Sequence, residues 1–130
     1  MLKIISNLWT AVIWTAVIFL LLGLNSDKVP DVNLFDLKFR DKLYHFLVFA
    51  IFSFLWHCHI VSRTKKDESR LAILLLIVGS MYGIGMEFFQ EAFTNRQFSW
   101  WDGLADILGT AAGLLMAKKS PYGNRGRNQN

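Results

Sequence analysis

Ionisable side chains in this sequence stand at the ends of apolar segments, where their types and spacing could support acid–base chemistry. Asp41 and His45 are four residues apart. On a helix they would share one face, and the carboxylate could orient the imidazole as a general base. Glu87 and Gln90 are three residues apart near the end of a later apolar segment. Because an unpaired carboxylate is costly in apolar surroundings, we expect Glu87 to have a polar partner.

A third polar group follows a short turn and comprises Arg96, Ser99 and Asp102. On a helix, Asp106 lies one turn after Asp102 on the same face. Gly109 and Gly113 continue this face within about 60°. Glycines at this spacing let two helix backbones approach closely, so we expect both carboxylates to lie inside a helical bundle.

Structural roles compete with chemical ones for several of these residues. Asp41 could cap a helix, and Lys42 could anchor it at a membrane interface. Asp102 in a first helical turn would be favoured by the helix dipole. The concentration of ionisable groups nevertheless favours a functional site. We expect Arg96 to pair with Glu87 or Asp102, because its planar guanidinium can bridge carboxylates.

A second group, His57, Cys58 and His59, has residue types that bind metals. Residues two apart on a helix point about 200° from each other, so both imidazoles could not reach one ion. We therefore predict no metal site there, and the single Cys excludes an intramolecular disulfide and multi-cysteine metal sites.

The elements that position these groups are apolar and long. The chain has 130 residues, of which 53% are hydrophobic and 18% charged, and the apolar segments cover 4–26, 43–62, 71–93 and 98–117. About 20 helical residues cross the roughly 30 Å core of a bilayer. We therefore predict an all-α, integral membrane four-helix bundle over residues 1–117 and a polar, disordered tail over 118–130. The net charge of +4 is scattered between apolar segments, which argues against a nucleic-acid partner.

Two of these segments allow another interpretation. A cleavable signal peptide could explain the first, but its apolar part is longer than usual and it lacks a small-x-small cleavage site. The fourth contains Asp102 and Asp106 in its first half, so it could be re-entrant. We favour four spans.

Lysine and arginine residues predict the orientation, because short cytoplasmic loops are enriched in them. With four spans, nine cations share one side with both termini: Lys3, Arg63, Lys65, Lys66, Arg70, Lys118, Lys119, Arg125 and Arg127. Five lie on the opposite side: Lys28, Lys38, Arg40, Lys42 and Arg96. We therefore predict cytoplasmic termini and a polar site near the outer face of the membrane.

Three stretches together resemble the VanZ-like family of bacterial membrane proteins. They are DKLYHF at 41–46, YGIGMEFFQ at 82–90 and RQFSWWDGLADILGTAAG at 96–113. The family pattern reads D-K-x-x-H, then E-x-x-Q, then R-x-x-S-x-x-D, and ends in G-x-x-x-G. The residues that match its polar positions are Asp41, Lys42, His45, Glu87, Gln90, Arg96, Ser99 and Asp102. The chain departs from the pattern at Asp106, where the family commonly has Asn, and near Thr94, where it often has Pro.

The resemblance implies a multi-pass protein of the bacterial cytoplasmic membrane with a role at the cell envelope. The family is named after a protein associated with low-level resistance to the glycopeptide teicoplanin. It supplies no biochemical activity for this chain.

The first functional hypothesis is binding of an anionic lipid, a lipid-linked envelope precursor or a lipoglycopeptide. Lys42 and Arg96 would contact phosphate, and Trp100 and Trp101 would position the headgroup. Gln90 and Ser99 complete this predicted ligand-binding set. The lipid bilayer itself is the other expected partner.

The second hypothesis is an intramembrane hydrolase or transferase. His45 would be the general base, oriented by Asp41, with Glu87 or Asp102 as acid and Arg96 on a developing oxyanion. We expect no cofactor, although a divalent metal ion at Asp41, His45, Glu87 and Asp102 is a variant of this hypothesis. A third hypothesis is a scaffold whose ion pairs only lock the bundle.

Overall fold

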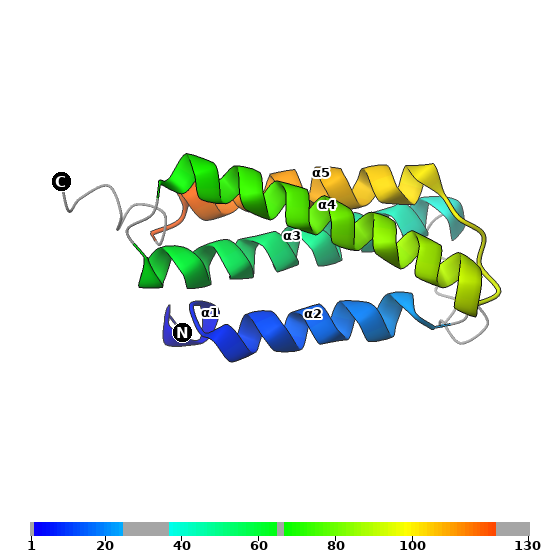
Figure 1. The fold of residues 1–130 in the computed structure, drawn as a ribbon, viewed down its shortest axis with the longest axis horizontal. Coiled ribbons are helices and arrows are strands. Elements are labelled where there is room, and N and C mark those ends of the chain that lie inside the picture. The colour runs from blue at the N-terminus through cyan, green and yellow to red at the C-terminus, as the bar shows by residue number, and fades with distance from the viewer. Residues whose placement is uncertain (1, 25–36, 65–66, 122–130) are drawn as a thin grey trace.

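A computed structural model describes residues 2–24, 37–64 and 67–121, and these ranges form helices and no strand. The helices are α1 (Leu2–Ile5), α2 (Leu8–Leu22), α3 (Leu37–Arg63), α4 (Glu68–Phe93) and α5 (Trp100–Lys119). The four long helices, α2 to α5, lie side by side as a bundle, and the short α1 lies at one end of it (Figure 1). The all-helical prediction is confirmed for the described residues.

Two of the described helices are long and apolar enough to cross a membrane: Phe39–Arg63 within α3, and α4. Only 44% of the most apolar stretch of α3 and 33% of that of α4 are buried inside the bundle. Many large apolar side chains remain on the outside, among them Trp9, Met81 and Leu115. The 15 residues of α2 are fewer than a straight span needs.

The helix boundaries differ from the predicted ones. The first apolar segment divides at Asn7, whose side chain accepts from Trp9 N and caps α2. Helix α3 begins at Leu37, six residues before position 43, the predicted start of this segment. Asp41 therefore lies one turn inside a helix and is not its cap. Helix α5 continues through Lys119, into the predicted tail, whose residues 122–130 lie outside the described ranges.

Glycines bring α5 very close to α3. A Cβ atom at Gly109 would overlap the backbone carbonyl of Phe46, and one at Gly113 would overlap the carbonyl oxygen of Ala50. Ser53 Oγ donates a hydrogen bond of 2.8 Å to Thr110 O across the same contact. Only residues without a side chain allow this approach, so the predicted role of the glycine face is supported by the geometry.

A second pair of glycines, in α4, lets this helix pack closely against Asp106 and Thr110 of α5. A Cβ atom at Gly79 would lie 2.7 Å from Thr110 Cγ2, and one at Gly83 would lie 2.6 Å from Asp106 Cβ. The buried residues Thr110 and Asp106 are thus enclosed between three helices. Helix α2 packs on a separate apolar core that includes Ile18, Phe49 and Met86, which belong to α2, α3 and α4.

Candidate functional site: a polar cluster at one end of the bundle

Most of the predicted site residues meet at the end of the bundle where α2 and α4 end and α3 and α5 begin (Figure 1). We call this set the polar cluster, and it comprises Asp41, Lys42, His45, Glu87, Arg96, Ser99, Asp102 and Asp106. The antiparallel arrangement of α4 and α5 brings its members from three helices and one connection to one end.

His45 is the centre of the cluster and is fully buried. Its Nδ1 donates a hydrogen bond of 2.9 Å to Asp106 Oδ1. Its Nε2 lies 3.7 Å from Glu87 Oε1. Asp106 therefore orients the imidazole, and the prediction that Asp41 orients it is wrong. The reason is that Asp41 lies one turn closer to the start of the helix, where its carboxylate pairs with Arg96.

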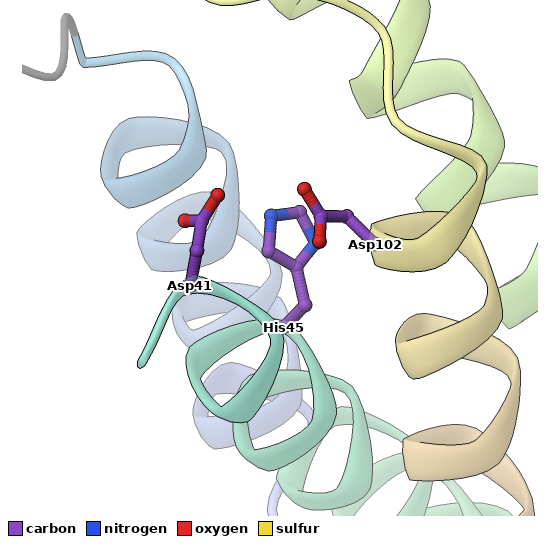
Figure 2. A group of neighbouring side chains, drawn as sticks. All are labelled: Asp41, His45 and Asp102. Atoms are coloured by element: carbon purple, nitrogen blue, oxygen red, sulfur yellow. The ribbon is translucent and has the colours of Figure 1, made fainter. Parts of the chain in front are cut away.

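Figure 2 shows Asp41 and His45 on α3 and Asp102 on α5, with their side chains pointing toward one another. Each of the three can offer one metal-ligating atom such that all three atoms lie within 4.8 Å of one another. The same holds for His45, Glu87 and Asp106. His45 belongs to both groups, so it links the carboxylates of α3, α4 and α5.

Arg96 pairs with Asp41 through Nη2. The expected pairing with Glu87 or Asp102 is therefore wrong. Glu87 faces the interior of the bundle, whereas the connection that carries Arg96 starts only after α4 has ended at Phe93. The guanidinium consequently reaches the second turn of α3 at the outer edge of the cluster.

Ser99 contacts Glu87 and Asp102, the two residues that were expected to bind Arg96. Its hydroxyl caps α5 by accepting from Asp102 N at 3.3 Å, and its own N–H donates to Glu87 Oε2 at 3.0 Å. Asp102 Oδ1 lies 3.4 Å from Lys42 Nζ. The first-turn position expected for Asp102 is thus present, together with a charge partner.

Gln90, Trp100 and Trp101 are the predicted site residues that lie outside the polar cluster. Gln90 is buried and donates a hydrogen bond of 2.8 Å from Nε2 to Leu22 O, so it ties α4 to the end of α2. Trp100 and Trp101 are 73% and 69% exposed and lie on the surface beside the cluster.

Several buried atoms of the cluster have no hydrogen-bond partner within the described ranges. They are His45 Nε2, Glu87 Oε1, Asp102 Oδ1 and Asp106 Oδ2. The cluster also holds four carboxylates against two cationic side chains, Lys42 and Arg96. An oriented imidazole whose second nitrogen has no hydrogen-bond partner can act as a general base, and the excess carboxylates can bind a cation.

Asp106 is the residue that the sequence-based site lacked. It is fully buried and holds His45. Its place on the face of Gly109 and Gly113 was a signal that it points into the bundle. Because the VanZ-like pattern commonly has Asn at this position, the predicted site did not include Asp106.

At the opposite end of α3, the imidazoles of His57 and His59 have different partners, as their helical spacing predicts. His57 Nε2 lies 3.7 Å from Glu68 Oε1, and His59 Nδ1 donates to Ser6 O at 2.9 Å. The two rings therefore do not converge on one ion.

Comparisons with known proteins add one relative. The chain is similar to an uncharacterized protein of Schizosaccharomyces pombe, with 28% identity over 99 residues. The match covers 76% of this chain and 59% of the yeast protein, so the chain spans less than two thirds of that relative. No family model and no solved structure matches the chain. The resemblance to the VanZ-like family stays a prediction.

Proposed function

We propose that the protein is a membrane-embedded helical bundle that binds the phosphate headgroup of an anionic lipid or lipid-linked precursor at its polar cluster. The observation that carries this proposal is the position of Lys42 and Arg96. Both cations lie at the outer edge of the cluster, with side chains 36% and 14% exposed. They are thus at the one end of the bundle where a headgroup could reach cationic and buried polar groups together.

The apolar exterior supports a location in a membrane. So many exposed large apolar side chains are unusual on a soluble monomer, and α3 and α4 have the length of spans. We propose that α2 and α5 complete four spans. The exposed Trp100 and Trp101 beside the cluster suit the membrane–water interface, where Trp is enriched.

The relative in Schizosaccharomyces pombe is a eukaryotic protein. Our proposal therefore places the protein in a membrane without specifying that the membrane is bacterial. The envelope role and any effect on glycopeptide susceptibility follow only from the family resemblance. Both stay predictions.

Nanodiscs provide a direct test of headgroup binding. The full chain would be reconstituted in phosphatidylcholine containing a minor fraction of phosphatidylglycerol, and the lipids retained by the released protein would be counted by native mass spectrometry. We expect enrichment of phosphatidylglycerol over its bulk fraction. Lys42→Gln should reduce this enrichment because it removes the more exposed cation at the cluster.

Lys119→Gln is the matched control, because Lys119 is an exposed cation at the other end of α5. It should retain the enrichment. Equal retention of phosphatidylcholine and phosphatidylglycerol by the parent, or equal losses in both variants, would contradict headgroup binding at the cluster.

Hydrolysis or group transfer is the second candidate, favoured by the orientation of His45. Asp106 holds Nδ1, and Nε2 is left with its lone pair toward Glu87, as in a general base. Hydrolysis of phosphatidylglycerol in the same nanodiscs, with release of diacylglycerol and glycerol phosphate or of phosphatidic acid and glycerol, would support this candidate. Loss of that release in His45→Gln, with phosphatidylglycerol still retained, would separate chemistry from binding.

A further inference from the structure

We propose that the buried part of the polar cluster binds one divalent first-row transition-metal ion through His45, Glu87 and Asp106. The ligands would be one ring nitrogen of His45 and one carboxylate oxygen from each of the two acidic residues. The inference goes beyond headgroup binding and does not depend on it.

The three residues lie close enough together to share one ion. Each can offer one ligand atom such that all three atoms lie within 4.8 Å of one another. The imidazole approaches Asp106 Oδ1 to 2.9 Å and Glu87 Oε1 to 3.7 Å. Two ligand atoms on one ion with bonds of about 2.0–2.2 Å are separated by about 3–4 Å. Small rotations of the side chains are therefore enough to admit an ion.

Each residue of the group also has one buried atom without a hydrogen-bond partner among the described residues. These atoms are His45 Nε2, Glu87 Oε1 and Asp106 Oδ2. All three side chains are fully buried, and buried polar atoms are normally satisfied. Three such atoms on neighbouring side chains point to a ligand that accepts lone pairs from nitrogen and oxygen, as a metal ion does.

Helix packing directs the two carboxylates toward each other. A Cβ atom at Gly83 would lie 2.6 Å from Asp106 Oδ2, so this oxygen lies against α4. Glu87 follows Gly83 by four residues and shares its face of α4. Glu87 Oε2 accepts the Ser99 N–H at 3.0 Å, which holds the side chain and leaves Oε1 for the ion. The proposed ligand set is therefore preorganised by contacts of the protein.

The other group of possible ligands, Asp41, His45 and Asp102, is a weaker candidate. Its two carboxylates already face the cationic side chains of the cluster. Asp41 pairs with Arg96, and Asp102 Oδ1 lies 3.4 Å from Lys42 Nζ. A metal ion there would compete with both cations.

Glu87 and Asp106 require a different counter-charge. Both face the imidazole of His45, and even a protonated imidazole would balance only one of their two negative charges. Buried charge without compensation is costly. With a neutral imidazole, one divalent cation brings the three side chains to zero net charge.

The imidazole nitrogen indicates the class of metal. Magnesium and calcium prefer oxygen ligands alone, whereas manganese, iron and zinc accept mixed nitrogen and oxygen sets. One nitrogen and two carboxylate oxygens therefore favour a transition metal.

The test uses Mn²⁺ as the probe and the full chain in detergent, stripped with a chelator and free of added lipid. The loss of the free Mn²⁺ signal in electron paramagnetic resonance measures binding. We expect saturation at one ion per chain, weaker competition by Mg²⁺ than by Zn²⁺, and pulsed-resonance modulation from one imidazole nitrogen. Failure here leaves headgroup binding untouched, because no lipid takes part.

Matched variants locate the ion. Glu87→Gln and Asp106→Asn should each weaken Mn²⁺ binding by at least about tenfold, and Asp106→Asn retains an oxygen that can accept from His45. Glu91→Gln removes an exposed carboxylate one turn further along α4 and should bind like the parent.

Three results would each overturn the proposal: no saturable binding, oxygen-only coordination in the parent, or equal affinities in these three variants. A greater loss of affinity in Asp102→Asn than in Asp106→Asn would also overturn it, because the ion would then lie in the outer group. The coordination measurement needs no variant, so a poorly folded substitution cannot hide the result.

Discussion

At the scale of single residues, the buried imidazole of His45 depends on a carboxylate from a distant part of the chain. Asp106 is 61 residues away in sequence and accepts the only hydrogen bond that Nδ1 makes among the described residues. Because a buried donor without an acceptor is costly, this bond matters for stability as well as for orientation.

Substitutions at Asp106 should show this dependence. Asp106→Asn retains an oxygen that can accept from Nδ1, whereas Asp106→Ala leaves the donor unpaired. We expect Asp106→Ala to lose about 1–3 kcal/mol more unfolding free energy than Asp106→Asn, measured by denaturant titration in detergent. Equal losses would show that the hydrogen bond contributes little beyond packing.

The ion pair between Arg96 and Asp41 should couple the α4–α5 connection to α3. Both groups are only partly exposed, so the coupling should exceed that of a surface pair without reaching that of a buried one. A double-mutant cycle with Asp41→Asn and Arg96→Gln should give about 1–2 kcal/mol. Additive losses in the cycle would mean that the two side chains do not interact in solution.

Local spacing predicted which residues enter the cluster but not how they pair. It placed Asp41 and His45 on one helix face and Asp102 in a first turn, as observed. It could not decide that Asp41 takes Arg96 and that Asp106 takes His45. Those pairings depend on the rotation and depth of α3 against α5, which the short-range sequence pattern does not specify.

At the scale of elements, α5 is the central helix because glycines of its own and glycines of α4 let it pack closely against two neighbours. Gly109 and Gly113 admit α3, while Gly79 and Gly83 of α4 admit the side chains of Thr110 and Asp106. The same close contacts that pack the helices also bring Asp106 to His45. Helix packing and the geometry of the cluster are therefore coupled.

Alanine substitutions of two glycines in α5 should have opposite effects. At Gly109 a Cβ atom would overlap backbone of α3, which cannot rotate away, and at Gly103 it would meet nothing within 4 Å. We expect Gly109→Ala to destabilise by about 1–3 kcal/mol. Gly103→Ala should be neutral or stabilise by up to about 1 kcal/mol, because alanine favours helix.

Thermal unfolding in detergent measures both effects. A melting temperature for Gly109→Ala at or above that of Gly103→Ala would show that α3 and α5 are further apart than in the structure.

The apolar segments predicted the four long helices but not all of their limits. Hydrophobicity extends across Asn7, so only its capping of α2 reveals the break. Conversely, charges at Lys38, Arg40 and Asp41 made the start of α3 look like a connection. These residues are compatible with helix, and polarity alone is a poor guide to where a helix begins at an interface.

At the scale of the whole molecule, polarity is distributed in an unusual way. Apolar side chains cover the outside, while the buried charges gather at one end. This is the reverse of a soluble bundle and is what a membrane favours. The end that carries the polar cluster also includes the connection between α4 and α5, and the connection between α3 and α4 lies at the opposite end (Figure 1).

Cysteine labelling can test whether these two ends lie on opposite sides of a membrane. Cys58 is the single, buried cysteine, so Cys58→Ser provides the background. Ser69→Cys and Gln97→Cys then place one thiol at an exposed position near each end of α4. Because nine of the fourteen cations fall on the side of Ser69, we expect that side to be cytoplasmic. A membrane-impermeant maleimide should label Gln97→Cys in intact cells, and Ser69→Cys only after permeabilisation. The reverse pattern would place the polar cluster at the cytoplasmic face, and labelling of both thiols in intact cells would show that α4 does not cross.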